Sequence, residues 1–125
     1  MHHNKLTNVL KLNARERYDY FIRKTADFET VYLIEEEDKF ISIESESKEF
    51  IIPVYPEYDF ADFFLKESCE NCVVKEMDIY DFIDLLDKLE KENIGLCGFP
   101  NHDDGIIVSA REMENDIRAE LELYE

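Results

Sequence analysis

The residues in this sequence that are best suited to bind a metal or to react are three cysteines and a histidine. Cys69 and Cys72 stand in the segment Ser-Cys-Glu-Asn-Cys, and a C-x-x-C spacing is shared by zinc knuckles and by thiol redox motifs. Cys97 and His102 are the residues that could complete a zinc site with this pair. Such a site would require all four side chains to bind one ion.

The predicted surroundings of the cysteines favour free thiols over a zinc or redox site. A redox-active cysteine begins a helix that follows a strand, because the helix N-terminus lowers its pKa, whereas Cys69 and Cys72 follow a predicted helix. Cys97 lies inside the apolar run 94–99, where a small buried thiol is common. We therefore predict free cytosolic thiols, no metal and no cofactor, and keep zinc and redox chemistry as alternatives.

Nucleophilic and acid–base catalysis are the next possibilities. His102 is followed by Asp103 on a predicted loop, but a catalytic base must also be held against a nucleophile. Asp81, Asp84 and Asp87 fall on the polar side of a predicted helix, and a solvated carboxylate lacks the burial or charged neighbour that shifts a pKa toward catalytic use. The sequence predicts no catalytic residue.

A surface that binds a ligand is another kind of site. Its candidate residues are aromatic or polar and lie near predicted turns: Tyr55, Tyr58, Phe99, His102 and Asp103. Aromatic residues are often buried for their area alone. The alternative to ligand binding is therefore that the three rings pack in the core. A pocket near these residues would suit a small-molecule-binding or regulatory domain.

The chain is strongly acidic, with a formal charge of -17 at pH 7. The first 24 residues contain six Lys or Arg and two acids, so the acidity belongs to the rest of the chain. Negative charge of this size opposes binding to nucleic acid or to an anionic membrane, because binders of phosphate need cations. A basic protein would be attracted, and the alternative is that the acidity serves solubility alone.

A chain of 125 residues can bury a core without disulfides or metal. We expect a single domain over residues 1–125, with an N-terminal arm at 1–12 and a compact α+β body at 13–125. No apolar run approaches the roughly 18 residues of a membrane span, and the polar start does not resemble a secretory signal. We expect a cytoplasmic protein, and we set His2 and His3 aside from functional argument.

Secondary structure follows from apolar spacing and capping residues. The chain is organised around residues 50–65, where an apolar strand, two prolines and an amphipathic helix follow one another. Helices are predicted from Ala14, Asp59, Asp78 and Ser109, the first and last of them with a capping box. Strands are predicted at 28–34, 40–44, 50–54, 73–77, 94–99 and 106–108.

The breaks between the predicted strands are short and polar, which favours antiparallel pairing. Four consecutive acids at 35–38 lack the alternating oxygen ligands and the glycine of a calcium loop, so we predict a charged hairpin tip there. The basic residues of the first predicted helix, Arg17 among them, are interpreted as a solvated face. The predicted fold is α+β, an antiparallel sheet of five to six strands with about four helices packed mainly on one face.

Several short segments together resemble a known family. They are Tyr18-Asp19-Tyr20-Phe21, Ala26-Asp27-Phe28-Glu29, Pro53-Val54-Tyr55-Pro56, Phe99-Pro100 and the segment 105–112. Over about residues 14–124 the chain resembles the domain-of-unknown-function 2750 family of small bacterial proteins. Because these motifs are structural, the resemblance implies no activity and no site residue.

Three classes of function are compatible with these observations. The charge, together with the absence of a catalytic pattern, favours a non-catalytic protein-binding module, such as an immunity or antitoxin-like protein that masks a basic effector. A small-molecule-binding or regulatory domain is the alternative. A metal or thiol enzyme that uses the cysteines and His102 is the least favoured class.

Overall fold

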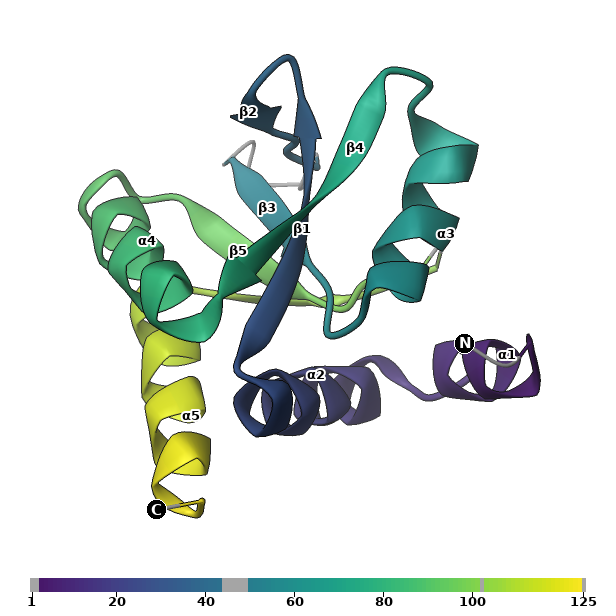
Figure 1. Cartoon of the computed structure of the whole chain (residues 1–125). Helices are drawn as coiled ribbons and strands as arrows, with labels where there is room; N and C mark the ends of the chain where they lie inside the picture. Colours follow the sequence, from purple (N-terminus) through teal and green to yellow (C-terminus); the bar gives the residue numbers. More distant parts are fainter. Residues whose placement is uncertain (1–2, 44–49, 102, 125) are drawn as a thin grey trace.

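The computed structural model describes residues 3–43, 50–101 and 103–124. Within these residues the chain forms five helices and six strands, coloured in sequence order in Figure 1. Their bounds are α1 (His3–Leu10), α2 (Ala14–Phe28), β1 (Thr30–Glu36), β2 (Lys39–Phe40), β3 (Ile51–Val54), α3 (Tyr58–Ser68), β4 (Cys72–Asp78), α4 (Ile79–Lys91), β5 (Gly95–Gly98), β6 (Ile106–Val108) and α5 (Ala110–Glu122). The predicted α+β composition is confirmed.

Local sequence signals decide where the helices begin. Asn13 caps α2: its side chain accepts a hydrogen bond from the Glu16 amide (2.8 Å), and the Glu16 carboxylate accepts one from the Asn13 amide (3.3 Å). The Ser109 hydroxyl caps α5 by accepting from the Glu112 amide (3.1 Å). α4 begins directly after Asp78. The Asn13 and Ser109 caps each satisfy an amide that the first helical turn leaves unpaired, whereas the Asp78 side chain makes no capping hydrogen bond. The predicted starts of α2, α4 and α5 are confirmed.

The strands form two small sheets, not the single sheet that the sequence predicts. The first has the order β2-β1-β4 and is antiparallel. The second has the order β3-β5-β6, in which β5 is antiparallel to β6 but parallel to β3. The prediction of one antiparallel sheet with five to six strands is wrong, because the chain between β3 and β5 passes through α3, β4 and α4. A crossover of that length brings β5 back in the same direction as β3.

The two sheets are joined where Tyr32 of β1 faces Tyr55, the residue after β3. The Tyr32 amide donates to the Tyr55 carbonyl (3.0 Å), and the Tyr55 amide donates to the Tyr32 carbonyl (2.8 Å). Another antiparallel bridge pairs Ile43 with Ile51. Together with the antiparallel β1–β2 pairing, it is the part of the predicted meander that the described residues contain.

The four acids at 35–38 lie at the β1–β2 hairpin, as predicted. Glu36 pairs with Lys39, and the two residues between them, Glu37 and Asp38, have φ angles of 51° and 66°. A type I′ turn, one of the two favoured two-residue hairpin turns, requires positive φ at both central positions. The prediction of a charged hairpin tip is confirmed.

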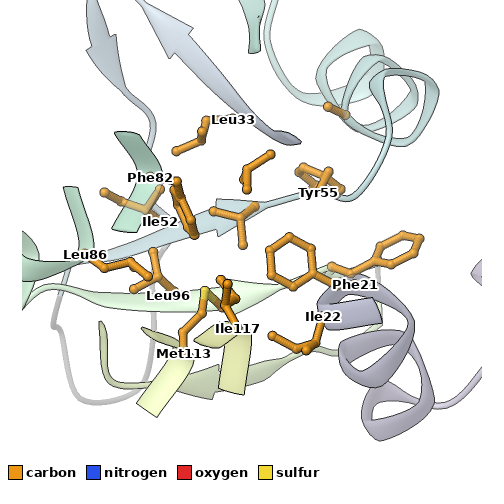
Figure 2. Close-up of a cluster of buried hydrophobic side chains, with 14 of the residues drawn as sticks. Phe21, Ile22, Leu33, Ile52, Tyr55, Phe82, Leu86, Leu96, Met113 and Ile117 are labelled. Atoms are coloured by element: carbon orange, nitrogen blue, oxygen red, sulfur yellow. The ribbon is translucent and has the colours of Figure 1, made fainter. Parts of the chain in front are cut away.

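The core receives apolar side chains from α2, β1, β3, α4, β5 and α5, which converge in Figure 2. Residues 51–56 are all buried, which confirms the central place of this segment, whereas Phe50 is 68% exposed. α3 begins at Tyr58, close to the predicted start at Asp59. α3 and α4 lie on opposite sides of the β1–β4 pair (Figure 1), so the prediction that the helices pack mainly on one face is wrong.

Part of the predicted N-terminal arm is helical and contacts the core. Leu6 and Leu10 of α1, and Leu12 in the following linker, pack against the buried cluster. None of the described helices combines the length and the apolar composition that crossing a bilayer requires.

Candidate functional site

A pocket of about 220 Å³ opens between α3 and the loop that follows β5. Its lining residues come from α1, α3 and that loop: Leu10, Phe60, Phe63, Phe64, Pro100, Asn101 and Asp103. We call it the aromatic pocket, because three phenylalanines of α3 form one wall. Its position follows from the amphipathic spacing of α3, which directs these rings toward the sheets and the loop.

The described residues among those predicted to bind a ligand are not gathered on one surface. Asp103 is exposed and lines the pocket. Tyr55 and Phe99 are fully buried and lie behind the wall, with ring centroids 5.7 Å from Phe64 and 4.6 Å from Phe60 respectively. These two rings are therefore core residues. Packing in the core was the alternative to ligand binding that the sequence left open for them.

Of the other two predicted residues, Tyr58 is not among the residues that line the pocket. Tyr58 is 52% exposed and packs edge-on against Tyr32, with ring centroids 6.4 Å apart. His102 lies outside the described residues. The sequence did not single out Phe60, Phe63 or Phe64 as lining residues, although their spacing indicated a shared helix face.

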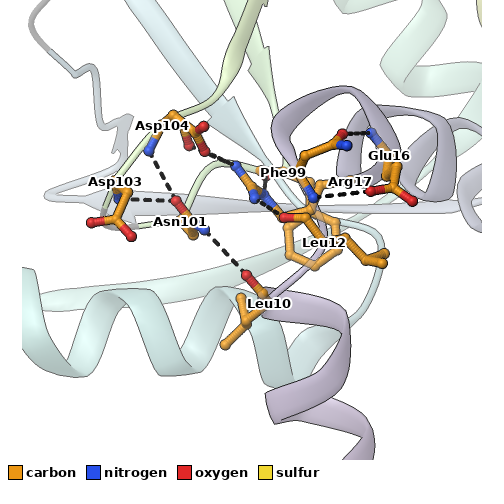
Figure 3. A network of polar contacts seen from close by, with 9 residues as sticks. Leu10, Leu12, Glu16, Arg17, Phe99, Asn101, Asp103 and Asp104 are labelled. Atoms are coloured by element: carbon orange, nitrogen blue, oxygen red, sulfur yellow. Dashed lines mark hydrogen bonds and ion pairs between the residues drawn. The ribbon is translucent and has the colours of Figure 1, made fainter.

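A buried guanidinium fixes the loop beside the pocket (Figure 3). Arg17 is 1% exposed. It donates to the carbonyls of Phe99 (3.0 Å) and Asp104 (2.9 Å), and also to the Leu12 carbonyl and the Asp104 carboxylate. The interpretation of Arg17 as part of a solvated helix face is wrong, because it shares the buried side of α2 with Phe21 and Thr25 at i, i+4 spacing. That spacing is the signal that could have identified it.

Asn101 reinforces the same loop from the other side. Its side-chain oxygen accepts from the amides of Asp103 and Asp104 (2.9 Å each), and its side-chain nitrogen donates to the Leu10 carbonyl (3.2 Å) (Figure 3). Arg17 and Asn101 therefore tie the loop 99–104 to the N-terminal helices and give the aromatic pocket a defined rim.

Burial suppresses ionisation of the Cys97 thiol and the Tyr55 hydroxyl. Cys97 is 2% exposed, and burial raises the pKa of its thiol to about 11. Burial also raises the pKa of Tyr55 well above its ordinary value, and its hydroxyl has no hydrogen-bond partner among the described residues. Cys97 is a neutral thiol at pH 7 and is poorly suited to act as a nucleophile, since the thiolate is the reactive form.

The cysteine pair forms a second candidate site, at the end of α3 and the start of β4. Cys69 and Cys72 are joined by a disulfide, so the prediction of free thiols is wrong for this pair and holds for Cys97. The C-x-x-C turn leaves the helix at Cys69 and enters the strand at Cys72, which brings the sulfurs together. A four-residue loop of this kind contributes about 2 kcal/mol in the chain-entropy model.

Glu36 is the third member of this group, and we call Glu36, Cys69 and Cys72 the cysteine–glutamate cluster. One Glu36 carboxylate oxygen lies 2.9 Å from Cys69 Sγ and 3.5 Å from Cys72 Sγ. Glu36 stands directly opposite Cys72 in the β1–β4 ladder. The sequence could not indicate Glu36, because its position depends on that register. Cys97, proposed as a further ligand from sequence, is absent from this cluster within the described residues.

A third candidate site is a corner where α2 ends and α4 begins. Its exposed residues are four carboxylates and two aromatic rings: Asp27, Phe28, Glu29, Asp78, Tyr80 and Asp81. We call it the acidic corner. The two segments meet because the Ile79 amide donates to the Glu29 carbonyl (2.9 Å) and Thr30 pairs with Asp78 across the β1–β4 ladder.

The two rings of the acidic corner are unusually exposed for their size. Phe28 is 60% exposed and Tyr80 is 57% exposed. The ammonium of Lys24 lies 5.6 Å from the centroid of the Phe28 ring, a distance at which a ring face attracts a cation. The sequence indicated that the chain is acidic, but it did not indicate the acidic corner. The corner forms only because the end of α2 meets the start of α4, and these two elements are far apart in the chain.

Comparison with known proteins confirms the resemblance noted in the sequence. No curated protein matches the chain. A family model described as protein of unknown function, DUF2750, matches residues 18–117. Since the match covers most of the 125 residues, this chain belongs to the DUF2750 family.

Proposed function

We propose that this protein is a non-catalytic module that binds a basic protein partner in the cytoplasm, in the manner of an immunity protein or antitoxin. The observation that supports the proposal is the acidic corner. It combines exposed rings with a surrounding of carboxylates, on a chain with a formal charge of -17.

The two parts of the corner would have different roles in binding. Aromatic side chains are enriched among the residues that contribute most to interface affinity, because they bury a large area at a low cost in conformational entropy. Carboxylates around them would attract Lys and Arg side chains and accelerate encounter with a basic protein. The position of Lys24 over Phe28 supports the expectation that partner cations can stack on these rings.

The first experiment compares protein captured from a lysate of cells that produce this chain. The baits are the wild type, a ring variant (Phe28→Ser with Tyr80→Ser) and a control variant (Tyr124→Ser), in which an exposed ring outside the corner is changed. We expect a basic protein, identified by mass spectrometry, on the wild type and the control. We expect its affinity for the ring variant to fall by at least about tenfold, the scale of a lost aromatic anchor.

A charge variant tests the second part of the proposal. Neutralising the four acids of the corner to Asn or Gln should slow association with that partner and reduce its salt dependence. The matched control neutralises four other exposed acids: Asp38, Glu70, Glu92 and Glu122. Equal binding by all these variants, an acidic partner, or no partner at either low or high salt would contradict the proposal.

The aromatic pocket favours a second candidate function, which is binding of a small apolar molecule. A cavity of 150 Å³ lined by apolar side chains can hold benzene, and the aromatic pocket has about 220 Å³ with three phenylalanine rings in its wall. The carboxylate of Asp103 at the pocket could accept a hydrogen bond from such a ligand.

Indole is a suitable probe for this pocket, because it is planar and carries a single N–H donor. We expect indole to raise the midpoint of thermal unfolding of the wild type, and to do so less for Asp103→Ala. The control Asp84→Ala changes an exposed acid on α4 and should respond like the wild type. No shift in the wild type, or equal shifts in both variants, would count against a ligand site here.

A further inference from the structure

The cysteine–glutamate cluster has a geometry that the disulfide alone does not explain. A disulfide sulfur carries no proton, so an ionised Glu36 gains no hydrogen bond from Cys69 Sγ at 2.9 Å. The same contact becomes favourable in two other states. A reduced thiol can donate to the carboxylate, and a metal ion can bind the carboxylate and both sulfurs.

We propose that reduction of the Cys69–Cys72 disulfide creates a Zn²⁺ site whose protein ligands are Cys69, Cys72 and Glu36. The three ligand atoms already lie within 4.8 Å of one another. Zn²⁺ binds Cys sulfur at about 2.3 Å and carboxylate oxygen at about 2.0–2.2 Å in a tetrahedron, and the C-x-x-C spacing is that of its common knuckles. The proposal is independent of the partner-binding function.

The backbone holds the ligands in place without the disulfide. Cys72 and Glu36 are opposite each other in a ladder of seven residue pairs, and Cys69 ends α3, with its amide donating to the Leu65 carbonyl (2.8 Å). Reduction therefore requires only that the two cysteine side chains rotate apart, to the roughly 3.8 Å that separates two sulfurs on a tetrahedral zinc ion.

An external dithiol supplies the electrons and protons that reduce the Cys69–Cys72 disulfide. The disulfide takes two electrons and two protons from the dithiol, which becomes a disulfide in turn, and Cys69 and Cys72 become thiols. Zn²⁺ then replaces the two thiol protons, which pass to solvent. Glu36 supplies the third ligand, and one position of the tetrahedron is left for water.

The charge around the cluster favours a bound cation over a reactive thiolate. Glu35, Glu37 and Asp38 adjoin Glu36 in the chain, and Glu70 lies between the two cysteines. These carboxylates attract a divalent ion. They oppose the negative charge of an uncomplexed thiolate, which is the form that thiol exchange catalysts need.

The test uses the whole chain, reduced with a phosphine that is then removed without air. Titration with Co²⁺ reports thiolate ligation as a charge-transfer absorption in the near ultraviolet, and competition with Zn²⁺ gives the zinc affinity. We expect one Zn²⁺ per reduced chain and none on the oxidised chain. Cys69→Ser with Cys72→Ser should abolish binding.

Glu36→Gln separates the proposed site from a simple dithiol, and circular dichroism verifies that each variant is folded. We expect the affinity for Zn²⁺ to fall by at least about tenfold, since even the loss of an outer-shell partner costs that much. The controls Glu122→Gln, an exposed acid at the end of α5, and Cys97→Ala should bind like the wild type. Equal binding by Glu36→Gln and the wild type, or no more Zn²⁺ on the reduced wild type than on the double serine variant, would overturn the proposal.

Discussion

Arg17 links two segments of the chain that are far apart in sequence. Its guanidinium donates to Leu12 in the linker after α1, and to Phe99 and Asp104 in the loop after β5. A guanidinium can serve these acceptors because it presents several donors in one rigid plane, whereas a lysine ammonium is a point charge on a flexible stem. At this position the charge is buried together with the carbonyls that solvate it.

Replacing Arg17 with Met should therefore lower the free energy of unfolding strongly. The apolar side chain would leave the carbonyls of Leu12 and Phe99 without this donor, and breaking a buried network of this kind typically costs about 3–5 kcal/mol of the free energy of unfolding. The control is Arg15→Met on the exposed side of α2, where an exposed ion pair with Asp19 contributes less than about 1 kcal/mol. Urea unfolding followed by circular dichroism measures the free energy of unfolding of both variants. A similar loss of stability in the two would contradict this account.

Single residues whose partners are close in sequence were predictable, and those with distant partners were not. Asn13 and Ser109 act within their own helices, so their capping roles follow from the pattern alone. The burial of Cys97 also follows from its apolar neighbours. Arg17 and Glu36 find their partners through tertiary contacts. The helical spacing of Arg17 with Phe21 and Thr25 could have indicated its burial, but no local pattern indicates the partners of either residue.

At the scale of elements, α2 and α5 approach β5 at a residue without a side chain. A Cβ built on Gly98 would lie 2.6 Å from Tyr18 Cδ2 and 3.5 Å from Met113 Cε. The rings and methyl groups of the two helices therefore occupy the space that any larger residue would need. The glycine is required by this close approach, because no glycine has positive φ within the described residues.

We expect Gly98→Ala to lower the free energy of unfolding by about 1–3 kcal/mol, the usual cost of overpacking a core. Gly95→Ala is the matched control. Its Cβ would meet the terminal methyl of Ile51 at 3.0 Å, which can rotate away, and the backbone oxygen of Val108 at 3.3 Å, which must shift by a few tenths of an ångström. Both substitutions gain a little stability because alanine reduces the conformational entropy of the unfolded chain. The difference in the free energy of unfolding between the two variants therefore measures the effect on packing. A variant at Gly98 as stable as the variant at Gly95 would show that the helices can shift.

The boundaries of the elements were more predictable than their pairing. Caps and apolar spacing placed the helices after Asn13, Asp78 and Ser109, and the β-rich runs placed strands close to their observed positions. The partner of each strand depends on contacts across the whole chain. The apolar pattern of β3 is satisfied equally by an antiparallel or a parallel neighbour, because both of its faces are buried, so the sequence favoured the wrong arrangement.

At the scale of the molecule, the basic N-terminal segment lies against the acidic remainder of the chain. Lys5 pairs with Glu57 (3.3 Å), and Arg17 pairs with Asp104. These contacts neutralise part of the acidity on one side. The acidic corner lies at the other end of α2 from the Arg17 contacts, so its carboxylates are free to influence what approaches there.

The parallel pairing of β3 with β5 has a consequence for how the protein is made. On the ribosome, β3 leaves the exit tunnel first, and its ladder with β5 must wait until α3, β4, α4 and β5 have all been synthesised. During that interval Ile51, Ile52 and Val54, which are buried in the finished fold, have no β5 to cover them. All three strands of the first sheet are therefore synthesised before the second sheet can form, and in the interval the uncovered apolar residues favour aggregation or binding to a chaperone.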